Sequence, residues 1–174
     1  VFKKAEEANI GDVIVAAEDQ EIVDDVKING GEAILTSNKH KTGTDRIYEA
    51  LRKSSISNID LVMNLQGDEP LMNVDDIKKL NNLMIKNKSK LGTLAAKVED
   101  RKLLSNQNVV KVITKEELKN SNFPEASNFL RKIGQVKQNV FHHLGIYCYQ
   151  LETLQNFVSI SQSDNEIQNK LEQL

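Results

Sequence analysis

Short unbroken apolar runs alternate along this chain with segments in which apolar residues return every three or four positions. The unbroken runs are typical of buried strands, and the wider spacing is typical of one helix face. Strands are predicted at 13–17, 33–35, 61–65, 94–98, 109–113 and 140–149, and helices at 1–8, 20–28, after a cap at Thr44, after residue 73, between 98 and 109, and in two pieces from 151 to 174. This alternation predicts an α/β fold with a mostly parallel sheet and helices on both of its faces.

The polar, turn-rich segment from 115 to 139 interrupts this alternation and is predicted to leave the sheet as a small excursion. The length of 174 residues suits one core, so residues 1–174 are predicted to form a single domain. The chain begins at Val1 within a charged segment and stops at Leu174 within a helical pattern. We therefore expect the domain to be incomplete at both ends.

The composition excludes several classes of protein. With 28% charged residues and a formal net charge of −2, the chain lacks the basic excess that binds nucleic acids or anionic membranes. No segment is apolar over the length that spans a bilayer, so membrane insertion is not expected. The single cysteine, Cys148, cannot form an internal disulfide, and a cytoplasmic location is therefore expected.

Candidate chemistry is concentrated where the central predicted strand, 61–65, ends in the turn Gln66-Gly67-Asp68-Glu69-Pro70. Ligands of open α/β sheets bind at the carboxyl ends of strands. Gly67 leaves room for a substrate beside the backbone, Gln66 offers an amide that donates and accepts, and Asp68 offers a hard oxygen ligand for Mg²⁺. An ordinary acidic turn also accounts for these residues when they are considered alone.

Three further clusters have both a chemical and a purely structural interpretation. The turn Thr42-Gly43-Thr44 leads into a helix N-terminus, whose free N–H groups suit an anion or a base carbonyl, but a plain capped turn also explains it. His143 and Tyr147 share one face of a predicted strand, where both could contact a ligand. A half-buried strand whose histidine hydrogen-bonds within the protein would show the same pattern. Residues 171–174 also fit a solvated helix face. The sequence contains neither a Gly-x-Gly-x-x-Gly motif nor a Walker loop, so nicotinamide and P-loop chemistry lack support.

Taken in order, these clusters resemble one family of enzymes. From its first predicted strand to its last residue, the chain is similar to the 3-deoxy-manno-octulosonate cytidylyltransferases, the CMP-Kdo synthetases of Gram-negative bacteria. The string from Gln66 to Pro70 is the most specific part, because the related sialic acid cytidylyltransferases differ there. The resemblance rests on Thr42-Gly43-Thr44-Asp45-Arg46, Asn64-Leu65-Gln66-Gly67-Asp68-Glu69-Pro70, Asn108-Val109-Val110-Lys111-Val112, His143-Leu144-Gly145-Ile146-Tyr147 and Leu171-Glu172-Gln173-Leu174.

The resemblance implies a three-layer, Rossmann-like nucleotidyltransferase fold and a reaction of lipopolysaccharide biosynthesis. CMP would pass from CTP to the anomeric hydroxyl of 3-deoxy-D-manno-octulosonate (Kdo), with Mg²⁺ as cofactor and pyrophosphate as the second product. The resemblance also implies a homodimer, to which the excursion, the strand Gly145–Tyr149 and the helix after it contribute. Cys148 and Phe157 are the candidate interface residues.

The resemblance also assigns roles to residues that match the family's motifs. Asp68 would bind Mg²⁺ and act with Gln66 at the reacting centre. The turn Thr42-Gly43-Thr44 would face the cytosine, and Arg46 would support that loop or reach a phosphate. Arg131 would pair with the sugar carboxylate. The residues expected to line the Kdo pocket are Gln66, Arg131, His143, Tyr147, Glu172 and Gln173.

Two features of the family have no counterpart between Val1 and Leu174. They are the basic phosphate loop with which the family opens and a late Val-Asp-Thr segment that holds a second metal ligand. Because positioned charges around the triphosphate supply most of the acceleration, residues 1–174 alone are predicted to lack transfer activity. Two alternatives stay open: a sialic-acid-type cytidylyltransferase, and a non-catalytic nucleotide-sugar-binding domain.

Overall fold

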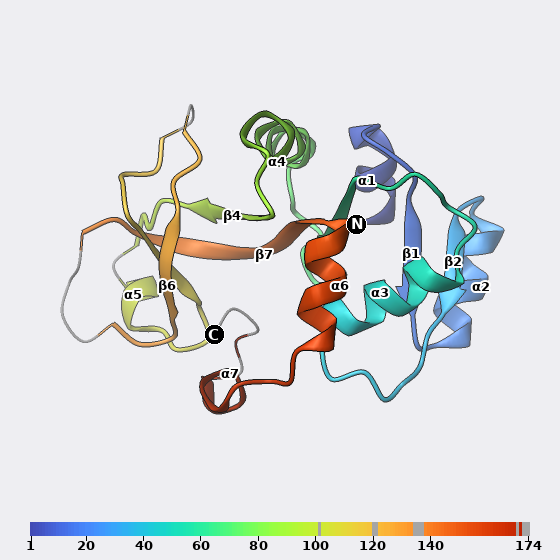
Figure 1. Ribbon diagram of the computed structural model, residues 1–174. Helices are drawn as coiled ribbons and strands as arrows, with labels where there is room; N and C mark the ends of the chain where they lie inside the picture. Colours follow the sequence, from blue (N-terminus) through green and yellow to red (C-terminus); the bar gives the residue numbers. More distant parts are fainter. Residues whose placement is uncertain (101, 120–121, 134–137, 170, 172–174) are drawn as a thin grey trace. The chain divides into compact units, whose positions relative to one another are not determined.

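The computed structural model describes the chain except for residues 101, 120–121, 134–137, 170 and 172–174 (Figure 1). The described residues form two compact units. The first unit comprises Val1–Gly92 and Ile146–Ile160, and the second comprises Thr93–Gly145 and Ser161–Leu174. A single domain over residues 1–174 stays a prediction, because a compact unit need not be a domain that folds alone.

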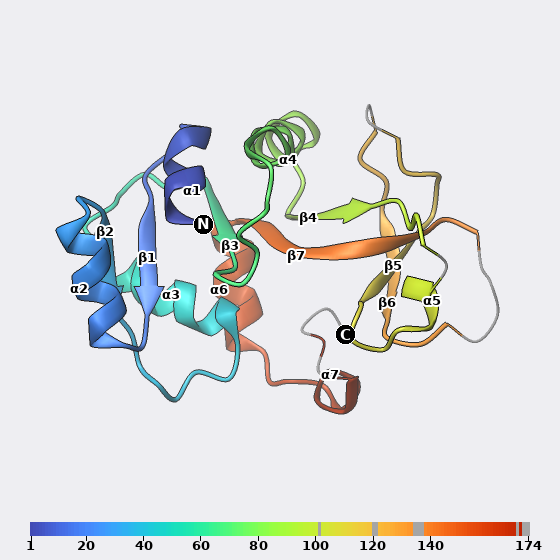
Figure 2. The ribbon, with the colours of Figure 1, turned by 180° about the vertical axis from the view of Figure 1, so that it is seen from behind.

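A strand–helix–strand segment forms one part of the first unit. Its elements are β1 (Ile14–Ala17), α2 (Gln20–Ile28) and β2 (Glu32–Leu35). The two strands pair in parallel, and α2 lies alongside them (Figure 2). Val23 of α2 is buried against Ala17 and Ala33, so the helix covers the apolar side chains that two short strands cannot bury by themselves.

A second pair of strands in the first unit positions the candidate site. The elements here are β3 (Leu61–Leu65), the last residues of β7 (Val140–Gln150), and the helices α3 (Gly43–Lys53) and α6 (Leu151–Ser159). β3 and β7 are antiparallel, with Asn64 opposite Tyr147 and Val62 opposite Tyr149. Directly opposed side chains share one face of a strand pair. On this face Tyr147, Tyr149 and Leu154 form a core with apolar residues of α3.

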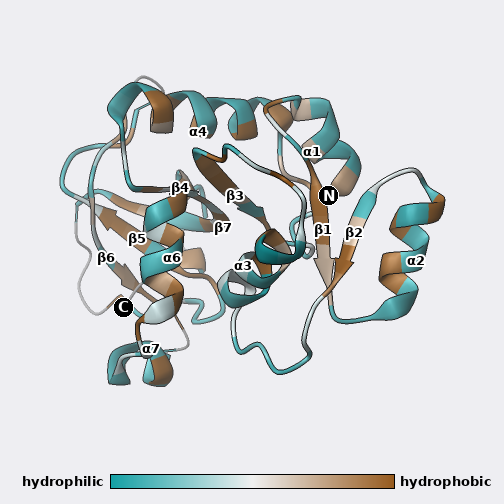
Figure 3. Cartoon of the chain, turned by 45° about the vertical axis from the view of Figure 1, so that its right-hand side comes forward, coloured by the Kyte–Doolittle hydropathy of each residue, from teal (hydrophilic) through white to brown (hydrophobic). Residues whose placement is uncertain are grey.

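Helices α1 (Phe2–Ala8) and α4 (Val74–Asn87) pack together in the first unit. In α4 the side chains of Ile77, Leu80 and Met84 are each 1% exposed, and their spacing gives the helix one apolar stripe (Figure 3). Lys4 Nζ donates to the carbonyl oxygen of Met72 at 2.6 Å and so ties α1 to the turn before α4. None of the described helices combines the length and the hydropathy that a bilayer crossing requires.

The second unit is built on antiparallel strands. Its elements are β4 (Leu91–Ala96, from Thr93 onward), α5 (Lys102–Ser105), β5 (Lys111–Thr114), β6 (Ala126–Leu130), the first residues of β7, and α7 (Asp164–Asn169). β5 lies between β6 and β7 and runs antiparallel to both. All residues of β5 are buried, as is typical of a strand with a partner on each side.

The prediction of a mostly parallel sheet is wrong for the described strands. β7 runs antiparallel to β3 and to β5, and β6 runs antiparallel to β5. Alternation of strands and helices predicts parallel pairing only where each helix returns the chain to the same edge of a sheet, and the segment after β5 instead folds back on β5. That segment was predicted to be a pure excursion, but its residues Ala126–Leu130 form β6. Its part in a dimer and the three-layer arrangement stay predictions.

Candidate functional site

The start of α3 is a capped helix N-terminus, as predicted, but the capping residue is Thr42. Thr42 has an extended backbone, and its hydroxyl oxygen accepts from the backbone N–H of Asp45 at 3.1 Å. The same hydroxyl donates to the Asp45 carboxylate at 3.0 Å. The prediction of Thr44 as the cap is wrong, because α3 begins at Gly43 and Thr44 already lies in its first turn.

The side chain of Thr44 faces the interior of the first unit. It is 1% exposed, and its Oγ1 lies 3.3 Å from the hydroxyl oxygen of Tyr149, so the two hydroxyls share a hydrogen bond. This contact anchors the first turn of α3 to β7. The Thr44 hydroxyl therefore lies away from solvent, and the contact of this residue with a nucleotide stays a prediction.

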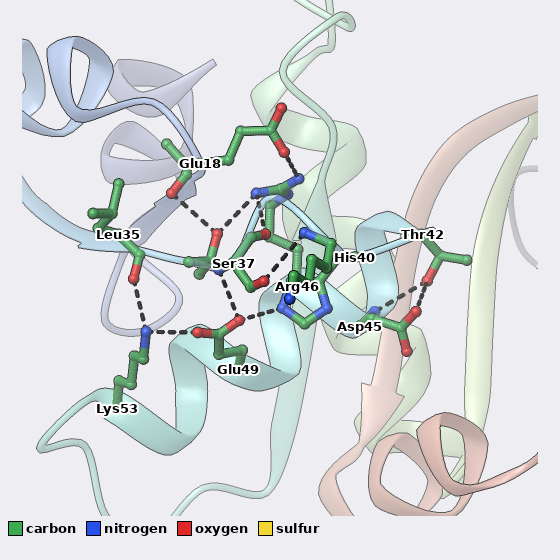
Figure 4. Close-up of polar contacts among 12 residues, drawn as sticks. Glu18, Leu35, Ser37, His40, Thr42, Asp45, Arg46, Glu49 and Lys53 are labelled. Carbon is green, nitrogen blue, oxygen red and sulfur yellow. Dashed lines mark hydrogen bonds and ion pairs between the residues drawn. The ribbon is translucent and has the colours of Figure 1, made fainter.

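Arg46 supports the loop that leads into α3 (Figure 4). Its guanidinium donates to Thr36 Oγ1 at 2.9 Å and to the carbonyl oxygen of Ser37 at 3.4 Å, and it forms an ion pair with Glu18. Thr36 in turn donates to the carbonyl oxygen of Ala17 at 3.0 Å. These bonds hold Arg46 against Thr36, Ser37 and Glu18, and both roles predicted for it, support of the turn Thr42-Gly43-Thr44 and contact with a phosphate, stay predictions.

Glu49 is a second anchor of the same loop, and no prediction from the sequence included it (Figure 4). Its carboxylate accepts from Lys53 Nζ at 2.5 Å and from the Ser37 backbone N–H at 3.0 Å, and it also contacts the His40 ring. These bonds, with that from Lys53 as the largest cause, lower the pKa of Glu49 to about 2. The only sign of this ion pair in the sequence was the four-residue spacing of Glu49 and Lys53 on a predicted helix. A pocket of about 500 Å³ beside α3 is lined partly by these side chains.

Asn64 of β3 is a buried polar residue with an unpaired group. Its side chain is 6% exposed, and no hydrogen-bond partner for its Nδ2 atom is found among the described residues. A Cβ atom added to Gly43 would lie 3.6 Å from this Nδ2, so the amide lies next to the start of α3. Leaving a buried donor unpaired costs roughly 1–3 kcal/mol. Asn64 belongs to the motif that ends at Pro70, and no role was predicted for it.

The turn after β3 places Gln66 and Asp68 at the end of that strand, as predicted. The backbone N–H of Glu69 donates to the carbonyl oxygen of Gln66 at 3.1 Å and closes the turn. Gly67 and Asp68 are exposed, and a Cβ atom on Gly67 would meet nothing within 4 Å. Within the described part of the chain no group of three His, Cys, Asp or Glu residues could hold a metal. A single accessible carboxylate nevertheless suits Mg²⁺, which proteins often hold by one or two carboxylates together with substrate phosphates.

In the second unit, His143 has the environment of a satisfied buried histidine. It is 7% exposed, its Nε2 lies 3.0 Å from Thr93 Oγ1, and the Phe129 ring meets it edge-on with centroids 5.1 Å apart. Burial is the larger cause, and the nearby charge of His142 the smaller one, of a pKa for His143 that is lowered to about 4. The imidazole is therefore neutral near pH 7 and suits hydrogen bonding to an uncharged partner.

Arg131 is held by backbone carbonyl groups of the second unit. Its Nε donates to the carbonyl oxygen of Asn169 at 2.7 Å, and its Nη1 donates to that of Gln107 at 3.3 Å. The carbonyl oxygen of Arg131 itself accepts from Lys111 Nζ at 2.7 Å. Lys111 has no exposed surface, and burial, together with the charge of Arg131, lowers the pKa of its amine. No role was predicted for Lys111, because its partners are backbone carbonyl oxygens, which a pattern of side chains does not reveal.

The residues predicted for the Kdo pocket are divided between the two units. Gln66 and Tyr147 belong to the first, Arg131 and His143 belong to the second, and Glu172 and Gln173 lie outside the described residues. Tyr147 is 5% exposed and belongs to the core shared with α3. Their assembly into one pocket stays a prediction.

Two residues were predicted to lie in a dimer interface, and for Cys148 this prediction is wrong because the residue is buried. Its side chain has no exposed surface, and burial raises the pKa of its thiol to about 12. Because alternate residues of a strand face opposite sides, Cys148 is directed away from its neighbours Tyr147 and Tyr149. Phe157 is partly exposed and packs against the Tyr149 ring with centroids 6.1 Å apart, so it stays a candidate.

Comparisons with known proteins agree over the length of the chain. A family model described as Cytidylyltransferase matches residues 1–174. The 3-deoxy-manno-octulosonate cytidylyltransferase of Thermodesulfovibrio yellowstonii is 37% identical over 187 residues, covering 100% of this chain and 72% of that protein. The enzyme of the same name from Nitrobacter winogradskyi is 36% identical over 182 residues, covering 100% of this chain and 68% of that protein. A CMP:2-keto-3-deoxy-manno-octonic acid synthetase solved in complex with CTP is similar with a TM-score of 0.84 and 30% identity, over 99% of this chain and 70% of that one.

Proposed function

The chain belongs to the 3-deoxy-manno-octulosonate cytidylyltransferase family, and from this premise we propose that it transfers CMP from CTP to Kdo. The products are CMP-Kdo and pyrophosphate, and the reaction serves lipopolysaccharide biosynthesis. The observation that carries the proposal is the similarity over 99% of the chain to a synthetase solved with CTP. The sialic-acid-type alternative is not favoured, because the curated relatives that match the whole chain carry the Kdo enzyme's name.

The reaction needs alignment and charge neutralisation more than it needs a protein nucleophile. The anomeric oxygen of Kdo forms a bond to the α-phosphorus of CTP while the bond from that phosphorus to the bridging oxygen breaks. Pyrophosphate leaves, and the hydroxyl proton is lost to solvent. Holding the two substrates in line supplies a large part of the acceleration of such a transfer.

Asp68 and Gln66 are proposed to act where the transfer occurs. The exposed carboxylate of Asp68 would hold Mg²⁺ beside Gly67, where the open backbone leaves room for phosphate groups. When bound, Mg²⁺ supplies positive charge against the charge that develops on the phosphates. Gln66, half-buried at the end of β3, would orient a substrate hydroxyl through its amide.

The start of α3 is proposed to hold the base of CTP. Thr42 is occupied as the helix cap and Thr44 by Tyr149, so the groups offered to the base are backbone groups around Gly43. Arg46 keeps the preceding loop in place through its bonds to Thr36, Ser37 and Glu18, and it acts as a positioning residue.

The sugar acid is proposed to bind through the six residues that the family resemblance assigns to it. Arg131 would pair with the Kdo carboxylate, and neutral His143 would bind a sugar hydroxyl. The other members of the proposed pocket are Gln66, Tyr147, Glu172 and Gln173. A homodimer and a cytoplasmic location also belong to this proposal.

The test is the formation of CMP-Kdo by the protein expressed from its complete gene. CTP, Kdo and Mg²⁺ are supplied together, and nucleotide sugar and pyrophosphate are both measured. Reactions with sialic acid in place of Kdo, with UTP in place of CTP, and with EDTA serve as controls. Formation of CMP-Kdo at rates well above those of all controls is expected. Equal turnover of sialic acid, or CTP binding without any transfer, would refute the proposal.

A further inference from the structure

Thr93, where β4 enters the second unit, has no part in the function described above. We propose that Thr93 is a positioning residue that holds His143 as the tautomer with its proton on Nε2, so that Nδ1 is the acceptor atom of the ring. The inference deepens the proposed function and rests on it, since it takes His143 as a residue that binds the sugar acid.

The Thr93 hydroxyl has two hydrogen-bond contacts but only one proton to give. Its Oγ1 lies 3.0 Å from His143 Nε2, and it donates to the carbonyl oxygen of Leu144 at 3.3 Å. Because a carbonyl oxygen can only accept, the hydroxyl proton is directed to Leu144. The bond to His143 then requires a proton on Nε2, which Oγ1 accepts. The opposite assignment, with the hydroxyl donating to Nε2, would leave the contact with Leu144 without a proton.

The imidazole of His143 is neutral near pH 7, so the position of its one ring proton decides what the ring offers. The residue is 7% exposed, and burial is the larger cause of its lowered pKa of about 4. A neutral imidazole has one donor nitrogen and one acceptor nitrogen. The hydrogen bond made by one nitrogen sets the state of the other. The bond from Nε2 to Thr93 therefore makes Nδ1 an acceptor.

The His143 ring is also held in its rotation. The Phe129 ring lies against it edge-on, with centroids 5.1 Å apart and ring planes at 85°. The three side chains come from β4, β6 and β7 within the second unit. A half-turn of the imidazole would remove Nε2 from Thr93 and would place a carbon atom there. The hydrogen bond and the aromatic contact together define where Nδ1 lies.

An acceptor nitrogen suits a hydroxyl group of the sugar acid and not its carboxylate. A hydroxyl can donate to Nδ1, whereas an ionised carboxylate has only lone pairs to place against the lone pair of Nδ1. The carboxylate is then left to the guanidinium of Arg131, which only donates. An acceptor that is fixed in advance also lowers the cost of ordering the site when the sugar binds. Thr93 is therefore expected to affect the binding of Kdo and not that of CTP.

The first test determines the tautomer directly, by ¹⁵N NMR of the protein expressed from its complete gene with ¹⁵N-labelled histidine, at pH 7 and without substrates. Couplings between the ring protons and the ring nitrogens distinguish a proton on Nε2 from one on Nδ1. The sequence contains three histidines, and the signals of His143 are those that His143→Ala lacks. We expect the Nε2–H form in the wild-type protein. A proton on Nδ1 would overturn the inference.

The second test removes the Thr93 hydroxyl. Thr93→Val keeps the shape of the side chain without the hydroxyl, and Thr93→Ser keeps the hydroxyl. Thr114→Val is the matched control, because Thr114 is 7% exposed in the same unit and its hydroxyl donates to the carbonyl oxygen of Glu116. Thr93→Val should add the Nδ1–H form to the spectrum. It should also raise the KM for Kdo about fivefold or more, the size of one hydrogen bond, and keep the KM for CTP within about twofold.

Thr93→Ser and Thr114→Val should keep the wild-type tautomer and the wild-type KM for Kdo. A folded Thr93→Val protein with an unchanged KM for Kdo would overturn the inference, and so would equal increases in both KM values, which would show a structural role alone. If Thr93→Val does not fold, the wild-type spectrum decides. A wild-type protein that makes no CMP-Kdo would refute the proposed function, whereas one that makes it with the His143 proton on Nδ1 would refute only the inference.

Discussion

Replacing Lys111 by methionine is expected to destabilise the second unit strongly. The fully buried Nζ of Lys111 donates to the carbonyl oxygens of Asn106 at 2.5 Å, Val109 at 2.8 Å and Arg131 at 2.7 Å. Methionine retains most of the apolar stem and removes every donor. Three carbonyl groups would then be left without this partner, and the loop that contains Asn106 would lose its tie to β5.

The magnitude follows from two opposing contributions. Hydrogen bonds from a charged donor stabilise by roughly 1.5–3 kcal/mol each, so three contribute about 4.5–9 kcal/mol. Burying the ammonium group costs several kcal/mol, which leaves a net loss of about 2–4 kcal/mol in the variant. For a chain of this size 1 kcal/mol corresponds to roughly 2–4 °C in melting temperature, so a fall of about 4–16 °C is expected.

The assay is thermal unfolding followed by circular dichroism, with Lys115→Met as the matched control. Lys115 is exposed and pairs with Glu125 at 2.7 Å, with side chains 57% and 69% exposed. Such a surface pair is worth less than about 1 kcal/mol. A Lys111→Met protein that melts within about 2 °C of the Lys115→Met protein would show that the three carbonyl contacts do not stabilise the fold.

Three further predictions follow from the candidate site. Asp68→Asn should leave the melting temperature unchanged and lower CMP-Kdo turnover by about two orders of magnitude or more, and near-normal turnover at ordinary Mg²⁺ would exclude Asp68 as the metal ligand. Glu49→Gln should have a lower free energy of unfolding than wild type at pH 7, measured by urea unfolding. Because folding depresses the Glu49 pKa from 4.5 to about 2, the difference in free energy should be fully present above pH 4.5 and should vanish as the pH falls towards 2. A difference in free energy that does not change with pH would contradict this prediction. His143→Ala should raise the KM for Kdo much more than the KM for CTP, and equal changes in steady-state kinetics would remove His143 from the sugar site.

Elements that depend on neighbouring residues could be predicted from the sequence. The strand at 61–65 and the helix at 20–28 occur with the predicted bounds, because each is defined by a local apolar pattern and a local breaking residue. The turn with Asp68 at the end of β3 was predicted for the same reason. The sequence therefore predicted which strand and which turn hold the candidate site residues Gln66 and Asp68.

Groups whose partners are distant in the sequence could not be predicted. Both Thr42 and Thr44 carry a hydroxyl that can cap a helix, and the Thr44 hydroxyl is instead paired with Tyr149, which lies 105 positions further along the chain. The roles of Lys111 and Glu49 likewise depend on loops that pack against them. Periodicity contains no information on such pairs.

By itself, then, the sequence determined where most strands and helices lie, where the turn after β3 is placed, and which family motifs occur, because all of these are properties of short segments. Only the tertiary structure decided that β7 runs antiparallel to β3, that Cys148 is interior and that the Asn64 amide lies unpaired beside Gly43. Strand direction, burial and hydrogen-bond satisfaction depend on which segments meet in space. A hydrophobic pattern is the same for either strand direction, and it leaves these properties open.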